Sequence, residues 1–133
     1  MKIWVDDVRP APKGEGYIWC KSVLEAIGCI GLFERSLFAH QWQLDTAKFS
    51  QLHSGLKLVP ENIKKEMEYK KIELIDIDHD AGDFAQYGGD YIKLLDWLEE
   101  TGRNYPIKIH SSNPVEVENM RKIIQKNKWV EIF

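Results

Sequence analysis

The chain has 133 residues and a formal net charge of −3, and 44% of its residues are hydrophobic and 29% are charged. Length and composition predict a single globular domain over residues 1–133 and exclude a disordered chain. The slightly acidic balance gives no general attraction to nucleic-acid backbones or anionic membranes, so neither double-stranded nucleic acid nor a membrane is an expected partner.

The expected compartment is the cytoplasm. The apolar run at the N-terminus is too short for a signal peptide, and no window approaches the roughly 18 apolar residues of a transmembrane helix. Cys20 and Cys29 form no CxxC pair. They are predicted as buried apolar side chains in a reducing compartment, rather than as a disulfide or a zinc site.

The first third of the chain predicts two strands and a helix. The strands are expected at residues 2–5 and 17–20, and the loop between them contains two prolines and two glycines, which exclude a helix there. Ser22 suits an N-cap, and Glu25 completes a capping box. Apolar residues then follow helical spacing until Gly31, where the helix is expected to end.

Residues 33–70 are predicted as a helical or irregular insert. The aromatic residues in it are scattered without a clear period. Three of them are assigned to a small secondary core or a subunit contact, with base stacking as the alternative: Phe38, Trp42 and Phe49. A homo-oligomer formed through residues 33–70 is therefore one hypothesis. His40 and His53 have no ligand-like partners at metal spacing and are predicted at the surface.

The second half of the chain alternates strands with helices. The predicted elements are a strand at 72–78, a helix at 88–102, a strand at 106–110, a helix at 114–127 and a strand at 129–133. Together with the first two strands, they predict an α/β fold: a three-layer, mainly parallel five-stranded sheet with helices on both faces.

Three polar clusters each follow a predicted strand: DDVRP at 6–10, DHDAGD at 78–83 and HSSNP at 110–114. In a parallel sheet the carboxyl ends of the strands meet at one edge, and ligands bind beyond that edge. The three clusters are therefore expected to converge on one site. The DHD segment alone has four possible explanations: residues that form a turn, a phosphoacceptor aspartate, a metal-binding site and acid/base catalysis.

His79 and His110 are the candidate catalytic residues. Imidazole titrates near neutrality, so one ring can accept a proton while the other donates one. Asp7 and Asp80 are assigned to an orienting or acidic cluster, because a carboxylate beside His79 would fix the direction of its ring. The alternative for each histidine taken alone is a structural role.

Asp6, Asp7 and Asp78 are the candidate metal ligands. Carboxylates gathered at one edge repel one another unless a cation or shared protons offset their charge. Mg²⁺ suits such an oxygen-rich site, and a divalent cation of this kind is the one cofactor considered. The alternative is a polar loop in which Arg9 forms a salt bridge.

Arg9, Ser111, Ser112 and Asn113 are the candidate phosphate ligands. Free backbone amides at the start of a helix bind phosphate, and an arginine offers a bidentate clamp. Asn113 is equally well explained as the N-cap of the helix that begins with Pro114.

Three blocks of sequence resemble the cyclic-phosphate processing receiver-like domains: IWVDDVRPAP, DIDHDAGD followed by GGDYIKLLDWLEE, and IKIHSSNPVEVENM. The resemblance covers residues 1–32 and 71–133. It implies a divergent CheY-like receiver sheet of strand order 2-1-3-4-5 that lacks the first helix. The positions that match the family's motifs are Asp6, Asp7, Arg9, Asp78, His79, Asp80, His110, Ser111, Asn113 and Pro114. Two features depart from the family: Glu116 stands where glycine is frequent, and the insert at 33–70 is long.

The resemblance implies a phosphoesterase, a hydrolase that acts on a cyclic phosphate of a nucleotide, a cyclic oligonucleotide or an RNA end. His79 and His110 would be its base and acid. A phosphate-containing small molecule or nucleotide is the expected partner. Two alternatives are a non-catalytic binder that sequesters a cyclic nucleotide, and a receiver-type signalling domain phosphorylated on Asp78. The signalling alternative requires a lysine after the last strand, which the segment WVEIF does not supply.

Overall fold

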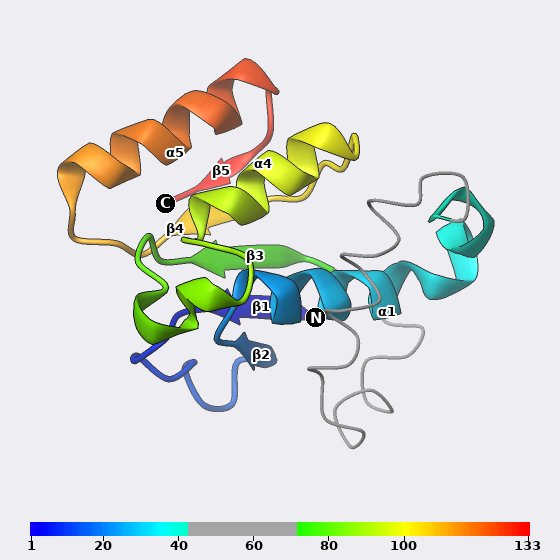
Figure 1. Cartoon of the computed structure of the whole chain (residues 1–133), viewed down its shortest axis with the longest axis horizontal. Helices are drawn as coiled ribbons and strands as arrows, with labels where there is room; N and C mark the ends of the chain where they lie inside the picture. Colours follow the sequence, from blue (N-terminus) through cyan, green and yellow to red (C-terminus); the bar gives the residue numbers. More distant parts are fainter. Residues whose placement is uncertain (43–71) are drawn as a thin grey trace.

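The computed structural model describes residues 1–42 and 72–133 (Figure 1). In chain order the elements are β1 (Lys2–Val5), β2 (Tyr17–Cys20), α1 (Val23–Trp42), β3 (Leu74–Ile77), the 3-10 helix η1 (Gly82–Gln86), α4 (Ile92–Glu100), β4 (Ile107–Ile109), α5 (Pro114–Lys126) and β5 (Glu131–Ile132). Each predicted strand is present, with its ends shifted by no more than two residues.

The five strands form one parallel sheet of order β2-β1-β3-β4-β5, which confirms the predicted α/β class and strand order. The register aligns Val5 with Cys20 on one side and with Ile77 on the other. Because these residues end their strands, the segments that follow them leave the sheet at the same edge. The predicted convergence of the polar clusters therefore has its structural basis in the strand register.

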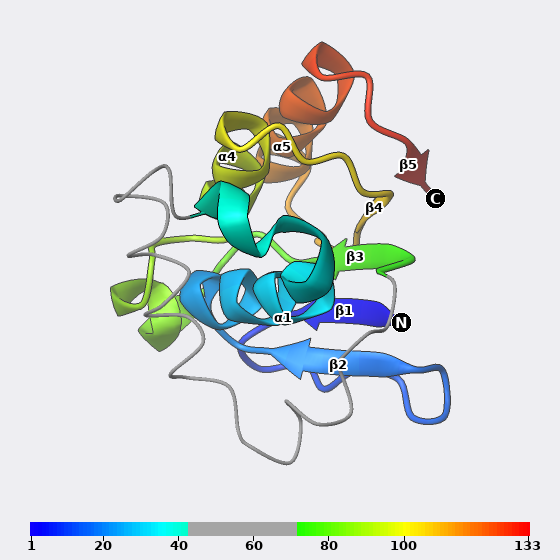
Figure 2. The same cartoon turned by 90° about the vertical axis from the view of Figure 1, so that its right-hand side faces the viewer.

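One face of the sheet carries the hydrophobic core. Ile3, Ile75 and Ile107 lie side by side in register and are fully buried. The helices α1, α4 and α5 all lie on this side of the sheet (Figures 1 and 2), and their buried residues join the same core cluster. Period-two alternation in each strand makes this possible, because every second side chain faces the helices.

The opposite face carries Trp4, Trp19, Asp76 and Lys108, which are also aligned across neighbouring strands. In the part of the chain that the structure describes, no helix covers this face (Figure 2). The expected second helical layer is thus not found within residues 1–42 and 72–133. The loop that joins β1 to β2 is free of helix, as its prolines and glycines predicted.

Helix α1 is longer than predicted. Its start is correct, since Ser22 Oγ accepts a hydrogen bond from the Glu25 backbone N–H at 3.1 Å, and the Glu25 carboxylate accepts from the Lys21 N–H at 3.2 Å. The predicted end at Gly31 is wrong, because the helix continues to Trp42. Ile30 and Leu32 on either side of the glycine are buried in the core. Their packing offsets the roughly 1 kcal/mol that an internal glycine costs.

The insert predicted at 33–70 is therefore helical over 33–42, as part of α1. Its remainder, with Phe49 and His53, lies outside the described residues, as do the side chains of Phe38, His40 and Trp42. The homo-oligomer and surface predictions made for this segment stay predictions. Among the helices in the described ranges, none combines the length and apolar character needed to cross a membrane.

A buried ion pair joins α1 to the connection between α4 and β4. Arg103 Nη2 lies 2.8 Å from Glu34 Oε2, and the two side chains are 12% and 6% exposed. The Tyr105 hydroxyl also donates to the Glu34 carboxylate. The guanidinium lies over the Trp97 ring, 4.4 Å from its centroid. These contacts connect α1 and the carboxyl end of α4 to the segment that leads into β4, away from the edge where the polar clusters lie.

Candidate functional site

Asp6 holds the first polar loop in its turn conformation through hydrogen bonds to the backbone. It directly follows β1, is 2% exposed, and its Oδ1 accepts hydrogen bonds from the backbone N–H groups of Val8 at 3.0 Å and Arg9 at 2.8 Å. Its Oδ2 lies 2.9 Å from His110 Nε2. Burial alone would raise the pKa of Asp6, but the hydrogen bonds from Arg9, Val8 and His110 lower it below its usual value.

His110 is held on both sides by carboxylates. Its Nδ1 lies 2.6 Å from Asp76 Oδ1, while its Nε2 faces Asp6, and the side chain is only 10% exposed. The ring also stacks on Trp4, with centroids 3.9 Å apart and planes 6° from parallel. Both ring nitrogens of His110 are therefore engaged with carboxylates, and these contacts fix the ring at the centre of the site.

Asp76 and Tyr17 belong to the same network, and the sequence did not identify them as site residues. The Tyr17 hydroxyl donates to Asp76 Oδ2 at 3.0 Å, and Asp76 is 2% exposed. Burial and this hydrogen bond raise the pKa of Tyr17 to about 12. A signal for Asp76 was present, because an acid between Ile75 and Ile77 points away from the core face.

His79 is the more accessible of the two histidines. Its Nδ1 lies 2.6 Å from Ser111 Oγ and 3.2 Å from Asp78 Oδ1, and its side chain is 25% exposed. Among residues 1–42 and 72–133, no hydrogen-bond partner is found for its Nε2. The Ser111 hydroxyl in turn accepts from the Asn113 backbone N–H at 3.1 Å. The contact between His79 and Ser111 ties the end of β3 to the end of β4.

The acidic cluster is formed by Asp6, Asp7 and Asp78, each of which offers an oxygen within 4.8 Å of the others. These are the three residues predicted as metal ligands. Burial raises the pKa of Asp7, and the charges of Asp6, Asp80 and Asp78 raise it further. The all-oxygen set fits a hard divalent cation such as Mg²⁺. Asp7 and Asp78 supply the freer oxygens, because three hydrogen bonds already occupy Asp6.

Asp80 does not contact the imidazole next to it. Its Oδ1 accepts from the Gly82 backbone N–H at 2.9 Å and forms the turn that leads into η1. Of the two acids that flank His79, Asp78 is the one in contact with the ring. The structure therefore gives the orienting position to Asp78, and Asp80 contributes charge and a turn.

The candidate phosphate ligands differ in their exposure and in the hydrogen bonds that they already form within the protein. The Arg9 guanidinium is exposed and donates to the His110 carbonyl at 3.3 Å. Asn113 is the N-cap of α5, as predicted, since its Oδ1 accepts from the N–H groups of Val115 and Glu116. That oxygen is engaged, which leaves Arg9 and the exposed Ser112 as the groups most open to an anion.

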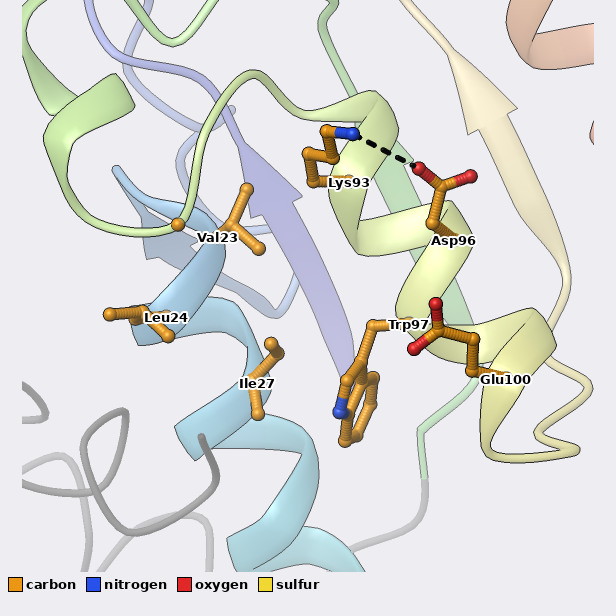
Figure 3. A pocket seen from close by; sticks show the side chains of 8 residues that line it. Val23, Leu24, Ile27, Lys93, Asp96, Trp97 and Glu100 are labelled. Atoms are coloured by element: carbon orange, nitrogen blue, oxygen red, sulfur yellow. Dashed lines mark ion pairs between the residues drawn. The ribbon is translucent and has the colours of Figure 1, made fainter. Parts of the chain in front are cut away.

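A separate hollow lies between α1 and α4 (Figure 3). It encloses about 160 Å³ and is lined by Val23, Leu24, Ile27, Gly88, Lys93, Asp96, Trp97 and Glu100. The Trp97 Nε1 is buried and has no hydrogen-bond partner in the described part of the chain. None of the lining residues belongs to the three polar clusters.

The sheet order, the helix-free first loop and the acids at the carboxyl edge define a receiver-like α/β domain. A sequence model of the cyclic-phosphate processing receiver domain matches residues 57–126, a little over half of the chain. The chain belongs to this family. The match includes the second and third polar clusters, whereas the first lies before it. Comparisons with curated proteins and with solved structures gave no match.

Proposed function

We propose that this protein hydrolyses a cyclic phosphate carried by a nucleotide, a cyclic oligonucleotide or an RNA end. The main support is one spatial relationship: the His79–Ser111 pair and the cluster of Asp6, Asp7 and Asp78 share the carboxyl edge of the sheet. Membership of the cyclic-phosphate processing family supports the same class of substrate. A proton-transfer group beside an acidic cation site suits phosphoryl chemistry.

The proposed reaction opens the cyclic ester. A water oxygen forms a new bond to phosphorus, and the bond from phosphorus to one ring oxygen breaks. The water loses a proton and the departing alkoxide gains one, so that the product is a phosphomonoester with a free hydroxyl. Catalysis of this kind relies on positioning and on stabilising charge that develops on the phosphoryl oxygens.

His79 is the group best placed to move the proton. Its Nδ1 is fixed by Ser111 and Asp78, and its ring is partly exposed. In the proposal the other ring nitrogen accepts the water proton. Ser111 keeps the imidazole at a set angle, and its own position is fixed by the Asn113 N–H.

His110 has a different part in the proposal. Its Nε2 reaches a reacting oxygen only after leaving Asp6, because both ring nitrogens are engaged. We therefore assign it first to holding Asp6 and Asp76 in place, and its role as the proton donor stays a prediction. Arg9, at the same edge, would bind the phosphoryl oxygens.

A divalent cation such as Mg²⁺ would be held by Asp7 and Asp78, and the buried Asp6 would complete the set of acids around it. When bound, it would supply Lewis-acid stabilisation of the phosphoryl oxygens. The raised pKa of Asp7 supports this assignment, since the repulsion among the acids is relieved by a positive charge.

The test is turnover of a panel of cyclic mononucleotides, cyclic oligonucleotides and RNA ends, measured with added Mg²⁺ and with EDTA. His79→Ala is expected to lower kcat by about 10²- to 10⁴-fold, the usual contribution of a positioned acid or base. Asp83→Asn is the control, because Asp83 is exposed and outside the acidic cluster. A folded protein that turns over no member of the panel would contradict the proposal.

A non-catalytic binder of a cyclic nucleotide is the second candidate. It is favoured by the engagement of both His110 nitrogens, which leaves His79 as the accessible imidazole of the pair. Recovery of unchanged ligand from the heated complex would support it over hydrolysis. Stable labelling of Asp78 by acetyl phosphate with Mg²⁺ would instead support a receiver-type signalling domain.

A further inference from the structure

We propose that the site binds the base of a nucleotide against an aromatic edge formed by Trp19, Lys21, Phe84 and Tyr87. The edge lies at the carboxyl end of β2 and on the segment around η1. The proposal rests on the proposed function for the identity of the phosphate site, and it narrows the substrate to cyclic phosphates that carry an aromatic base.

The first observation is a lysine held against aromatic rings. Lys21 Nζ lies 4.5 Å from the centroid of the Trp19 ring and 5.9 Å from that of Phe84. Phe84 and Tyr87 are neighbours, with ring centroids 6.4 Å apart and planes tilted by 41°. Rings of this kind stack on nucleobases, and a cation beside them donates hydrogen bonds to the nitrogen and oxygen acceptors at the edge of a base.

The second observation is exposure. Tyr87 is 39% exposed, and Trp19 and Phe84 are half-buried. The Phe84–Tyr87 pair and Trp19, which Lys21 connects to Phe84, thus keep part of their surface in contact with water. Covering them with a flat base removes apolar area from water without any rearrangement of the hydrophobic core, because none of the three belongs to the core cluster.

The third observation fixes this edge next to the reacting groups. Trp19 Nε1 donates to the Asp6 carbonyl at 2.6 Å, so the indole is attached to the loop that bears the acids. Phe84 lies in η1, which begins at Gly82 beside the Asp7 carboxylate. The Tyr87 carbonyl accepts from the Leu24 N–H at 3.1 Å and is thereby fixed to the start of α1.

These contacts give the substrate two separate points of attachment. The phosphate would bind at the acidic edge near Arg9, and the base would stack on Phe84 and Tyr87 with Lys21 at its rim. Stacking is tolerant of base identity, because every base has an aromatic face. The aromatic edge is therefore expected to select nucleotides over base-free cyclic phosphates, with only a small preference among bases.

The test compares adenosine 2′,3′-cyclic phosphate with the base-free ribose 2,3-cyclic phosphate. The full-length chain is titrated with each ligand by calorimetry, and the same samples are assayed for hydrolysis product. The nucleotide is expected to bind at least about fivefold more tightly, since stacking on one aromatic side chain contributes this much or more. In NMR spectra, the nucleotide should shift the ring resonances of Phe84 and Tyr87, and the base-free ligand should leave them unchanged.

The variants Tyr87→Leu and Phe84→Leu are expected to reduce the advantage of the nucleotide towards onefold without changing the Kd of the base-free ligand. Phe133→Leu is the matched control, since Phe133 is an exposed aromatic residue next to β5 at the other edge of the sheet. If the Phe84 variant does not fold, the Tyr87 variant and the ring shifts still decide the outcome.

The possible results separate the two proposals. Equal Kd values for the two ligands, or no binding of either, would overturn the aromatic edge as a base site and leave the hydrolytic function standing. A preference for the nucleotide would support the base site whether or not product forms. Hydrolysis itself is overturned only when the whole panel of cyclic phosphates is recovered unchanged.

Discussion

The carboxylate of Asp76 and the imidazole of His110 are joined across two neighbouring strands by a contact of 2.6 Å between Oδ1 and Nδ1. Asp76 is 2% exposed and the His110 side chain 10%. The pair lies on the sheet face without a helical layer in the described ranges, where Trp4 stacks on the imidazole. A buried contact between a carboxylate and a histidine fixes the direction in which the far nitrogen of the ring points.

Replacement of Asp76 by asparagine is expected to weaken both stability and activity. Asp76 uses separate oxygens for its two contacts, Oδ2 for Tyr17 and Oδ1 for His110, and the amide replaces one of these acceptors with an NH2 donor. The loss of a hydrogen bond to a charged group costs about 1.5–3 kcal/mol. Turnover should fall on the order of 10- to 100-fold, by analogy with carboxylates that orient metal-bound histidines. Urea unfolding and kcat measure the two effects.

Tyr17→Phe is the control for Asp76→Asn. It removes one of the two donors to Asp76 and leaves the contact with His110 in place, so its effect on kcat should be the smaller. An equal loss in both variants would show that packing, and not the orientation of His110, explains the result.

The ionisation of Tyr17 should be delayed in the folded protein. Its pKa is raised to about 12 by burial and by the hydrogen bond to Asp76, against about 10 for an unperturbed tyrosine. The folded protein therefore holds a proton that the unfolded chain has lost between these values. Its contribution to stability is complete below about pH 10 and is lost as the pH rises towards 12. Tyrosinate absorbance of the native protein and of Tyr17→Phe, recorded against pH, tests this.

Asp7→Asn is expected to raise the melting temperature in the absence of divalent cations. Burial and the neighbouring acids raise the pKa of Asp7, so ionising this carboxyl costs more free energy in the folded protein than in the unfolded chain. Mg²⁺ should stabilise the native protein by mass action and have little effect on the variant, because a ligand has been removed.

Thermal unfolding with and without Mg²⁺ measures both changes. Asp83→Asn, an exposed acid outside the cluster, should leave the Mg²⁺ effect intact. A native protein whose melting temperature is insensitive to Mg²⁺ would argue against the metal site.

Glu34→Ala should be strongly destabilising. It removes the carboxylate that contacts the mostly buried Arg103 guanidinium and takes an acceptor from Tyr105. Breaking a buried ion pair in this way costs about 3–5 kcal/mol. Lys126→Met breaks an exposed pair with Glu99 and should change little. Denaturant unfolding distinguishes the two, and similar midpoints for both variants would contradict a special role for the buried pair.

Local pattern was enough to predict the strands and the edge at which the site lies. Each strand has its own apolar run, and a parallel sheet brings the residues after those runs together without any knowledge of side-chain contacts. Ser22 and Asn113 were correctly predicted as caps because capping depends on residues three positions apart. Gly31 misled the prediction of α1, because core packing on both sides outweighed its low helix propensity.

The partners within the site could not be predicted in the same way. Tyr17, Asp76 and His110 are separated by dozens of residues, and their contacts depend on strand register. Both histidines were identified, but a single sequence does not show that one is enclosed by two acids while the other contacts Ser111. That difference arises from alternation along β3, which sends Asp76 to one face and leaves His79 at the edge.

Gly82 has a consequence for how this site can vary. Its φ is +52°, and a Cβ at this position would lie 2.4 Å from Asp7 Oδ2. A larger residue there would push the Asp7 carboxylate out of its present position, so residue 82 in the loop after β3 and the acid in the loop after β1 are linked. In a chimaera with another member of the family, DDVRP and the segment through η1 should be transplanted as one piece. A transplant of either segment alone is expected to displace the acid nearest the glycine.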